Sequence, residues 1–531
     1  MVNACKGDQL PVSAFTKYAD GMMPQGTSAY EKRGVAIDIP VWSSEKCIQC
    51  NQCSFVCPHA CIRPVVMTEE EKAAAPEGME ALPMMGMPGY YFAITVSAMD
   101  CLGCGLCANV CPGNKAAEVL KMDSFETYKA EQAFFDYGLK VSEKPEVLKK
   151  FKKDSVKGSQ FVQPYLEFSG ACAECGETPY AKLITQLYGD KMMIANATGC
   201  TSIWAGSVPS TPYTVDRQGK GPAWSNSLFE DNAEFGFGMK LAQDSMRSSI
   251  LKKLEALNEN TSNEGLKKAI TEYISTYDKT EENGIASDKL IAELEKCGCE
   301  AAKEILKDKD YIAKKSQWIF GGDGWAYDIG YGGLDHVLAA RKDVNIFVFD
   351  TEVYSNTGGQ ASKATNIGAI AQFAAAGKDI KKKDLAAIAM SYGYVYVAQV
   401  SMGANMAQCV KAIKEAESYD GPSLIIGYSP CISHGIRKGM GFASEEMKLA
   451  VDSGYWNLFR FDPRRSLEGK NPLVMDSKAP TMDYQDFIMR ENRYINLQKR
   501  DPERAAKLFG AAENNAKEKY DKLVQLSNME V

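Results

Sequence analysis

Two cysteine runs decide the fold of the first part of the chain: CIQCNQCSFVCP at residues 47–58 and CLGCGLCANVCP at residues 101–112. Each run has three cysteines separated by two residues, and a Cys-Pro pair follows after three more residues. This spacing is typical of [4Fe-4S] cluster ligands, whereas a zinc ribbon requires two separate pairs of cysteines. We therefore expect two iron-sulfur clusters in a small domain that they stabilise.

The same pattern predicts which cysteine binds which cluster. In two-cluster ferredoxins, the fourth cysteine of each run crosses to the other cluster. One cluster is then expected on Cys47, Cys50, Cys53 and Cys111, and the other on Cys101, Cys104, Cys107 and Cys57. Because crossing places the clusters close together, the domain is predicted to conduct electrons between them. Cys61 lies outside the pattern and is expected to be a buried free thiol.

Composition narrows the chemistry. The 531 residues include 17 cysteines and only 3 histidines, so thiolate ligands are favoured over imidazole. His59, His336 and His434 are expected to pack or to form hydrogen bonds rather than to act as acids or bases. A net charge of -7 without a long basic tract argues against nucleic acid or a membrane as partner, and the run 381–383 of three lysines is interpreted as a solvated turn. The first residues lack the features of a secretory signal, so a cytoplasmic protein is expected.

From about Phe161 the pattern changes to short apolar runs that alternate with turns and helical stretches. The predicted strands are residues 192–197, 318–322, 344–350, 394–400 and 423–429. Their nearly continuous apolar character favours strands that are buried on both faces of a mostly parallel sheet. Residues 385–410 carry no charge, but their polar residues and glycines favour a buried strand flanked by helices over a membrane span.

We therefore predict an α/β protein that is preceded by a small α+β domain. The predicted divisions are a connecting segment at 1–40, a ferredoxin-like 2[4Fe-4S] domain at 41–122, an α/β domain at 123–478 and a helical tail at 479–531. A Lys/Glu-rich stretch at about 240–315 is expected to be a helical insertion in the α/β domain.

A third group of cysteines is less specific. Cys172 and Cys175 form a C-x2-C pair, and Cys200 and Cys431 each follow a predicted strand, at the sheet edge where ligands bind. Together they would supply four thiolates for a third cubane. Spacing alone also allows a redox dithiol or half of a metal site for the pair. The remaining cysteines in helical sequence are expected to be inert: Cys297, Cys299 and Cys409.

A diphosphate site is predicted at residues 322–325, which read GDGW and follow a predicted strand. The glycines would let the backbone approach a diphosphate, and Asp323 would bind the divalent cation that neutralises it. Thr351, at the end of the next predicted strand, and the carbonyl of Val353 would complete an oxygen ligand set. A Gly-Asp-Gly turn alone is common, but the pair at this separation is similar to the thiamine diphosphate motif. Many thiamine enzymes have Asn at the position of Thr351.

These motifs closely resemble the C-terminal half of pyruvate:ferredoxin (flavodoxin) oxidoreductase. The resemblance extends from LPVSAF and YEKRG near the N-terminus through GDGWAYDIGYGG and DTEVYSNTGGQ to about residue 470. It implies a third [4Fe-4S] cluster on Cys172, Cys175, Cys200 and Cys431, and Mg2+ on Asp323, Thr351 and the carbonyl of Val353. It also implies that Asn356 lies near the reacting carbon as a catalytic residue. The implied thiamine diphosphate contacts are Glu177, Cys200, Gly322, Asp323, Gly324, Trp325, Thr351, Glu352, Val353, Tyr354, Ser355 and Asn356.

The resemblance implies an oxidoreductase of anaerobic metabolism. Its reaction is the oxidative decarboxylation of pyruvate to acetyl-CoA and CO2, with coenzyme A as acyl acceptor and one-electron transfers through three clusters to ferredoxin or flavodoxin. In that family the glutamate that engages the aminopyrimidine ring lies in an N-terminal domain, which we do not find. We therefore expect a partner N-terminal half and a homo-oligomer of the assembled enzyme.

Two alternatives remain from the sequence. The first is a related 2-oxoacid:ferredoxin oxidoreductase that acts on 2-oxoglutarate or a branched-chain acid. The second is a non-catalytic polyferredoxin subunit whose α/β domain serves only for docking.

Overall fold

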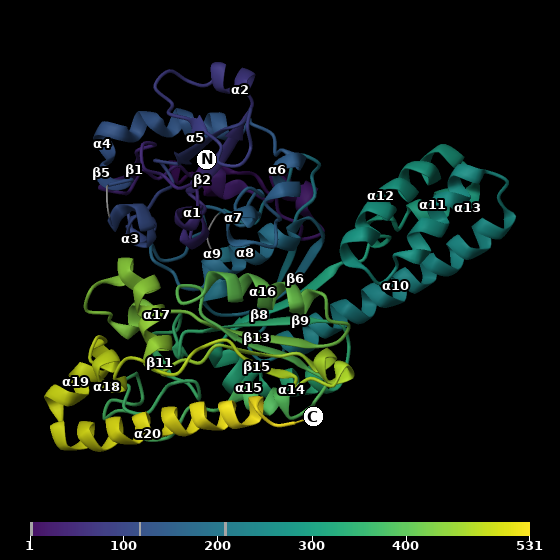
Figure 1. The fold of residues 1–531 in the computed structure, drawn as a ribbon. Helices are drawn as coiled ribbons and strands as arrows, with labels where there is room; N and C mark the ends of the chain where they lie inside the picture. Colours follow the sequence, from purple (N-terminus) through teal and green to yellow (C-terminus); the bar gives the residue numbers. More distant parts are fainter. Residues whose placement is uncertain (1–3, 116–117, 207–209, 531) are drawn as a thin grey trace.

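A mixed eight-stranded sheet forms the centre of the larger part of the molecule (Figure 1). The computed structural model describes residues 4–115, 118–206 and 210–530. The strand order is β15-β14-β12-β13-β9-β8-β6-β7. The strands from β12 to β7 are parallel, β14 is antiparallel to β12, and β15 is antiparallel to β14. The strands are β6 (Met192–Ala197), β7 (Ala223–Ser227), β8 (Ser316–Gly322), β9 (Asn345–Asp350), β12 (Tyr396–Val400), β13 (Ser423–Tyr428), β14 (Phe459–Phe461) and β15 (Leu473–Met475).

The five predicted strands are all present, and the mostly parallel α/β fold is confirmed. Three strands at the sheet edges were not predicted. The sequence of β7 is AWSNS and its strand is partly exposed, while β14 and β15 have only three residues each. Short or polar edge strands lack the apolar run that identifies the central ones, because only the central strands are buried on both faces.

Helices cover both faces of the sheet. In Figure 1, α8 (Thr178–Tyr188) and α16 (Met406–Glu417) lie above it, while α14 (Tyr331–Ala339) and α15 (Leu385–Met390) lie below. All residues of α8 are buried, because this helix is enclosed between the sheet and the cluster domain. The uncharged stretch 385–410 forms α15, β12 and the start of α16, so its interpretation as a buried strand with flanking helices is confirmed. Within the described ranges, no helix is both long and apolar enough to span a membrane.

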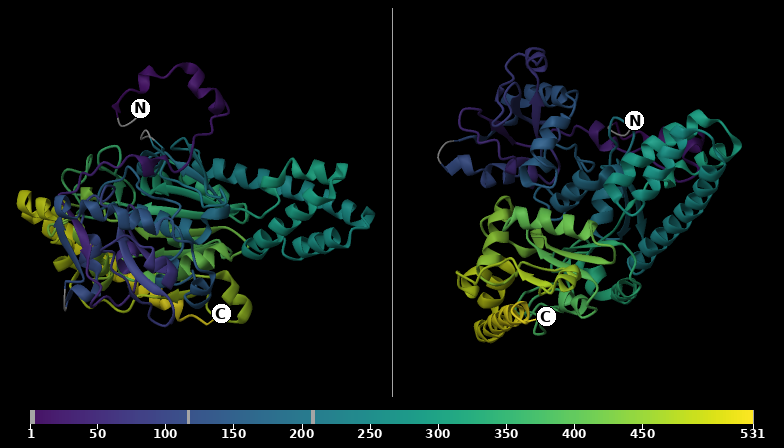
Figure 2. Two further views of the ribbon diagram at one scale, coloured as in Figure 1. Left: turned by 90° about the horizontal axis from the view of Figure 1, so that it is seen from above. Right: turned by 45° about the vertical axis from the view of Figure 1, so that its right-hand side comes forward.

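The predicted helical insertion forms an arm that projects from the sheet (Figures 1 and 2). It has its own apolar core, which includes Leu254, Ile270, Leu290 and Ile305. Its amphipathic helices bury one face in this core and expose charged residues on the other. The helices are α10 (Asn232–Asn260), α11 (Glu264–Ser275), α12 (Thr280–Cys297) and α13 (Glu300–Leu306).

The two cysteine runs fold in the same way within the small domain. Each run makes a turn at left-handed residues, Gln49 and Asn51 in the first run and Gly103 and Gly105 in the second. A short helix follows, α1 (Gln52–Val56) or α3 (Leu106–Val110), and the two helices contact each other. The surrounding strands are β1 (Asp38–Trp42), β2 (Ile62–Met67), β3 (Leu82–Pro83), β4 (Tyr91–Val96) and β5 (Leu120–Ser124).

Shorter elements lie within the two parts of the molecule and between them. They are α2 (Glu69–Ala73), α4 (Phe125–Tyr128), α5 (Gln132–Gly138), α6 (Pro145–Lys150), α7 (Val156–Ser159), α9 (Cys200–Gly206), β10 (Val353–Tyr354), β11 (Gln360–Ala361) and α17 (Ala443–Asp452). The C-terminal tail consists of α18 (Tyr484–Ile488), α19 (Asn492–Arg500) and α20 (Pro502–Ser527). Tyr494 and Phe509 of this tail are buried in the main core, so the tail is part of the α/β body.

Candidate cluster ligands and diphosphate site

The eight cysteines of the two runs line two separate cavities. Cys47, Cys50, Cys53 and Cys111 line one cavity, and Cys57, Cys101, Cys104 and Cys107 line the other. The fourth cysteine of each run therefore lies with the first three cysteines of the other run, as the crossed assignment requires. Within the described residues, no three His, Cys, Asp or Glu side chains converge on a single metal ion. Four cysteines at each cavity match the number of thiolates that bind one [4Fe-4S] cluster.

Backbone N–H groups donate hydrogen bonds to cysteine sulfurs at both cavities. The N–H groups of Gln49 and Gly103 donate to the Sγ atoms of Cys47 and Cys101, each over 3.4 Å. Both donors have positive φ angles, which turn the peptide N–H back toward the preceding cysteine. Hydrogen bonds to sulfur stabilise the negative charge on a cluster and tune its potential.

Burial makes the thiolate form of these cysteines unfavourable without a metal. Burial raises the pKa of Cys53 and Cys107, and neighbouring cysteines raise it further. Burial also raises the pKa of Cys101 to about 12. Since a metal ligand must be a thiolate, cluster binding would displace these protons and compensate the buried charge. Cys61 is buried, lines the same cavity as Cys57, and donates from its N–H to the Sγ of Cys57 over 3.4 Å.

A buried lysine of α8 holds the cluster domain against the sheet. Lys182, which is 1% exposed, donates from Nζ to the carbonyl oxygens of Ser54, Phe55 and Cys57; the last two distances are 3.2 and 3.0 Å. These carbonyls lie at the C-terminal end of α1, where a positive charge is favourable. Burial lowers the pKa of Lys182 to about 8. The lysine thus places a cationic group beside one ligand of the second cavity.

The structure brings the third group of cysteines together at one end of the parallel strands. Cys200 follows β6, Cys431 follows β13, and Cys172 and Cys175 precede α8. Burial raises the pKa of Cys200, and the charges of Glu177, Cys175, Cys431 and Cys172 raise it further, so all four thiols lie within electrostatic reach of one another. The N–H of Glu177 donates to Cys175 Sγ over 3.4 Å, and the N–H of Ser433 donates to Cys431 Sγ over 3.5 Å.

This third group lies next to the cluster domain. Ala173, between Cys172 and Cys175, lines the cavity of Cys57, Cys101, Cys104 and Cys107. A separate small cavity is shared by Cys175 with Val56 and Leu106, the residues directly before Cys57 and Cys107. Clusters on the second and third groups would therefore be neighbours.

The predicted cation ligands converge on one point. Asp323 and Thr351 are 1% and 4% exposed, and Thr351 Oγ1 lies 3.0 Å from Asp323 Oδ1 and 3.1 Å from the carbonyl oxygen of Val353. Ser355 Oγ lies 2.5 Å from the same hydroxyl. In an octahedral shell with metal–oxygen distances of about 2.1 Å, neighbouring oxygens are about 3 Å apart. The oxygen set thus fits Mg2+.

The electrostatics of Asp323 favour a cation at this point. Burial raises its pKa well above the usual range, and the carboxylate of Asp350 raises it further. Its second oxygen accepts a hydrogen bond of 2.6 Å from Ser362 Oγ, a residue that the sequence did not indicate. A bound cation would offset the repulsion between the two buried carboxylates.

Two of the glycines near Asp323, Gly321 and Gly324, leave no room for a side chain. A Cβ atom at Gly324 would lie 2.5 Å from the ring of Tyr354, and one at Gly321 would collide with Trp325. Gly324 begins a π-helical turn, Gly324–Ile329, which frequently marks functional sites. Trp325 is fully buried, and its Nε1 has no hydrogen-bond partner in the described part of the chain. Gly321 and Gly324 thus allow Trp325 and Tyr354 to pack tightly against this backbone segment.

Two other predicted contacts have different environments. Glu177 is buried next to Cys175, accepts a hydrogen bond of 2.9 Å from Trp204 Nε1, and has a pKa raised by burial to about 7. Asn356 is exposed in the turn after β10. The structure thus places Glu177 among the third cysteine group, whereas Asn356 faces solvent at the rim.

Glu352 does not lie with the other predicted cofactor contacts. Its side chain is fully buried and makes ion pairs with Arg493 (2.7 Å) and Lys382 (3.1 Å), and it accepts hydrogen bonds from Tyr455 (2.5 Å) and Asn366 (2.9 Å). Burial alone would raise its pKa, but Lys382 and Arg493 outweigh burial and lower the pKa to about 2. Its backbone has a φ of 62°. Glu352 therefore anchors the loop between Thr351 and Val353 from behind.

The interpretation of the three lysines as a solvated turn was wrong for Lys382. Its side chain is 14% exposed and also pairs with Asp350 at 2.8 Å. Burial would lower its pKa, but Asp350 and Glu352 raise it above the usual value. This pairing could not be predicted from the sequence, because a lysine between two others in a polar stretch is usually solvated.

His434 connects the loop of Cys431 to the cation loop. Its Nε2 lies 2.7 Å from the carbonyl oxygen of Thr351, which requires that Nε2 carries the proton. The ring is fully buried, and burial lowers its pKa to about 3. His434 is thus a neutral hydrogen-bonding residue, as predicted.

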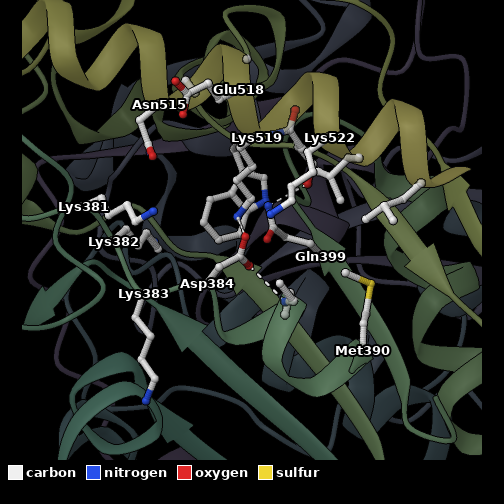
Figure 3. A pocket seen from close by; sticks show the side chains of 18 of the residues that line it. Lys381, Lys382, Lys383, Asp384, Met390, Gln399, Asn515, Glu518, Lys519 and Lys522 are labelled. Carbon is white, nitrogen blue, oxygen red and sulfur yellow. Dashed lines mark hydrogen bonds and ion pairs between the residues drawn. The ribbon is translucent and has the colours of Figure 1, made fainter. Parts of the chain in front are cut away.

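A further cavity lies elsewhere, between α20 and the β14–β15 edge of the sheet (Figure 3). Its volume is about 1000 Å3, and among the predicted site residues only Glu352 lines it. Lys519 of α20 pairs there with Asp384 at 3.1 Å. The cavity therefore lies on the opposite side of the Glu352 network from Asp323.

Family models match three parts of the chain. A domain of unknown function, EKR, matches residues 1–36, a 4Fe-4S dicluster domain matches residues 46–115, and the thiamine pyrophosphate enzyme C-terminal TPP-binding domain matches residues 301–426. The 4Fe-4S and thiamine pyrophosphate cofactors predicted from the motifs are thus confirmed at the level of domains.

Known proteins are similar over nearly the whole chain. Pyruvate:ferredoxin oxidoreductase of Moorella thermoacetica is 54% identical over 99% of this chain and 45% of its own length. Pyruvate-flavodoxin oxidoreductase of Klebsiella pneumoniae is 51% identical over 99% of this chain and 44% of its own length. The mitochondrial pyruvate dehydrogenase [NADP(+)] of Euglena gracilis is 48% identical over 97% of this chain and 28% of its own length.

Among solved structures, 2-oxoglutarate:ferredoxin oxidoreductase from Magnetococcus marinus matches with a TM-score of 0.31 and 15% identity, over 62% of this chain and 87% of that chain. The chain spans somewhat less than half the length of the Moorella and Klebsiella relatives. The comparisons confirm that it resembles, over almost all of its length, a part of the pyruvate:ferredoxin and pyruvate-flavodoxin oxidoreductases, with a 4Fe-4S dicluster domain followed by a thiamine pyrophosphate-binding domain.

Proposed function

We propose that this chain supplies the electron-transfer and diphosphate-binding part of a pyruvate:ferredoxin or pyruvate-flavodoxin oxidoreductase. The assembled enzyme would convert pyruvate and coenzyme A to acetyl-CoA and CO2. The observation that carries the proposal is the convergence of Asp323, Thr351 and the Val353 carbonyl at the sheet edge where Cys200 and Cys431 also lie. A polyferredoxin that used the sheet only for docking would not need this buried oxygen set.

The residues at the predicted diphosphate site would bind the cation or contact the diphosphate. Mg2+ would be held by Asp323, Thr351 and Val353, and Ser355 stands within reach as a further oxygen. The segment 322–325 would face the diphosphate through its backbone; a Cβ at Gly322 would meet only the Phe349 carbonyl oxygen, at 3.9 Å, whereas one at Gly324 would collide with Tyr354. When bound, thiamine diphosphate supplies the carbon nucleophile for a 2-oxoacid. We assign Asn356 to the rim of this site, from where it would contact the substrate.

Glu177 and Cys200 would border the cofactor on the side of the third cysteine group. The raised pKa of Glu177, about 7, lets it hold a proton near neutral pH. A protonated Glu177 adds no negative charge beside four thiolates, which favours a cluster at this position. The third [4Fe-4S] cluster is therefore proposed on Cys172, Cys175, Cys200 and Cys431.

The order of the cavities suggests a path for electrons. The third cysteine group borders the cavity of Cys57 through Ala173, and the cavity of Cys47 is formed by the other ends of the same two runs. We propose that Cys172, Cys175, Cys200 and Cys431 would hold the cluster nearest the cofactor, that Cys57, Cys101, Cys104 and Cys107 would hold the next, and that Cys47, Cys50, Cys53 and Cys111 would hold the outermost. Together the three clusters would supply a path for one-electron transfer. The N-terminal domain would be provided by a further part of the protein or a separate subunit.

The acceptor and the oxoacid depend on more than this chain. The relatives include proteins named for ferredoxin, flavodoxin and NADP(+), with 48 to 54% identity to the chain. We therefore propose ferredoxin or flavodoxin as the electron acceptor. The two relatives of which this chain covers about 45% are named for these acceptors. A preference for 2-oxoglutarate or a branched-chain acid is the alternative.

The test is a reconstitution under anaerobic conditions. The chain, together with the N-terminal half of a pyruvate:ferredoxin oxidoreductase, should reduce methyl viologen when pyruvate, coenzyme A and Mg2+ are present, and the chain alone should not. The Asp323→Ala variant is the matched control, since it keeps every cysteine. Faster turnover of 2-oxoglutarate than of pyruvate would favour the alternative substrate, and full activity of the chain alone would exclude a required second half.

A further inference from the structure

The turn between α12 and α13 places two thiols against each other. Residues 297–299 read Cys-Gly-Cys, and the two Sγ atoms are 2.9 Å apart. Cys297 ends α12, Gly298 has a φ of 62°, and Cys299 is extended before α13. Because Gly298 adopts the left-handed conformation, the chain reverses and both side chains point to the same side. The expectation that both cysteines lie in helices is therefore wrong for Cys299.

This pair is remote from the clusters. It lies at the outer end of the arm. Helix α10 leaves the sheet at Asn232 and runs outward, and α11 begins at its outer end. The end of α12 lies beside this start of α11, because a Cβ at Gly265 would be 3.1 Å from Glu293 Oε2. Both thiols are partly exposed and pack against the edge of the arm core. The twelve predicted cluster cysteines all lie outside this arm.

The geometry distinguishes a dithiol from half of a metal site. Two thiolates on one tetrahedral Zn2+ at about 2.3 Å would have sulfurs about 3.8 Å apart. The observed separation of 2.9 Å is shorter, and no third His, Cys, Asp or Glu side chain in the described residues completes a metal site there. The separation lies between that distance and the roughly 2.05 Å of a disulfide bond.

We propose that Cys297 and Cys299 form a redox-active dithiol that exchanges with disulfide-bonded substrates. In the first step the thiolate of one cysteine attacks a sulfur of the substrate disulfide, and a mixed disulfide and one thiolate product form. The second cysteine, after losing its proton to solvent, attacks the mixed disulfide and releases the second thiolate product. The net reaction oxidises the dithiol by two electrons and reduces one substrate disulfide to two thiols.

Two further observations support exchange rather than a structural bond. The hydrogen bond from Cys297 lowers the pKa of Cys299, which makes Cys299 the better attacking thiol and Cys297 the resolving one. A disulfide across a single residue closes a very short loop, so it restricts the unfolded chain little and contributes little stability. Formation of this disulfide would therefore change the chemistry of the pair more than the stability of the fold.

Mass spectrometry can measure the oxidation state of Cys297 and Cys299 directly. Trypsin cleavage after Lys296 and Lys303 gives the peptide CGCEAAK, which contains both thiols and no other cysteine. The anaerobically purified full chain is equilibrated in buffers with increasing ratios of glutathione disulfide to glutathione, alkylated and digested. As the ratio rises, we expect the doubly alkylated peptide to be replaced by the intramolecular disulfide. This form is lighter than the dithiol by two hydrogens and takes up no alkyl group.

Single variants separate the two steps. Cys297→Ser should accumulate a glutathione adduct on Cys299 about tenfold above the wild type, because the intramolecular thiol that resolves the adduct is missing. Cys5, an exposed thiol without a neighbouring cysteine, is the internal control for simple adduct formation. Persistence of the doubly alkylated peptide at every ratio, or separate glutathione adducts on both cysteines of the wild type, would overturn the proposal.

Discussion

The cluster domain and the cation site hold their ligands in opposite ways. In the cluster domain, the eight cysteines come from two contiguous runs, and burial raises the pKa of Cys53, Cys101 and Cys107 among them. In the cation site, Asp323 and Thr351 come from different strands and are fixed by hydrogen bonds to Ser362 and Val353. The loop behind them is anchored by Arg493, 141 residues away from Glu352. The first site is encoded locally and needs its metal, whereas the second is built in advance by the fold.

This difference predicts opposite effects on binding and stability at Asp323. Asp323→Asn should lower Mg2+ affinity by at least about 100-fold, because a carboxylate ligand is lost. In the metal-free protein it should be neutral or stabilising by about 1 kcal/mol, since one of two neighbouring buried carboxylates loses its charge. Calorimetric titration with Mg2+ and thiamine diphosphate, on the reconstituted enzyme, and urea unfolding of the chain measure the two effects. Equal losses of binding and stability would contradict a preformed site.

Arg493→Met should destabilise the α/β body by about 3–5 kcal/mol, because Glu352 and Glu491 would lose their buried partner. The iron bound by the two cysteine runs should not change, since the hydrogen bonds and ion pairs of the Arg493 side chain in the described part of the chain go to Glu352, Tyr455 and Glu491. Urea unfolding and iron analysis check the two parts. Arg493→Lys, which keeps the charge, should recover part of the loss, and a Met variant as stable as the wild type would show that the anchor is unnecessary.

Among the described residues, Glu417 is a carboxylate without ion pairs of the kind that Lys382 and Arg493 form with Glu352. Burial raises its pKa to about 7, while Ser316 donates a hydrogen bond of 2.6 Å to it. Because the unfolded chain ionises near the ordinary pKa and the folded chain does not, this group lowers stability as pH rises from about 4.5 to 7. Its side chain is partly accessible, so we expect Glu417→Gln to gain about 1–3 kcal/mol at pH 8 and almost nothing at pH 4.5. Urea unfolding at the two pH values compares the variant with the wild type. A gain that does not depend on pH would contradict this account.

Lys182→Met tests the contact between the two regions. Loss of the donor to three carbonyl oxygens should cost about 1–3 kcal/mol. Loss of its positive charge should make the potential of the adjacent cluster more negative. Spectroscopic redox titration monitors the cluster, and Lys182→Arg, which keeps a cation, is the control. An unchanged potential in the Met variant would show that the lysine acts only on packing.

The same difference explains what the sequence could predict. The crossed cysteine sets follow from a spacing pattern, and the Asp323–Thr351 pair follows from polar residues at the ends of two predicted strands. Ser362, Lys382 and Arg493 were missed, because each reaches its partner through the tertiary fold and none lies in a motif. Glu352 was grouped with its neighbours, but its positive φ angle turns its side chain to the other side of the loop. The exposed Cys297–Cys299 pair depended on one left-handed glycine, which sequence alone does not reveal.

The central claim is that the third cysteine group binds a cluster beside the preformed cation site. Iron per chain in the anaerobically purified protein tests it most directly, with the wild type compared with Cys431→Ser. Three clusters predict about twelve iron atoms in the wild type and about eight in the variant, whose two remaining clusters keep their signals. About eight iron atoms in both proteins would show that Cys172, Cys175, Cys200 and Cys431 bind no cluster.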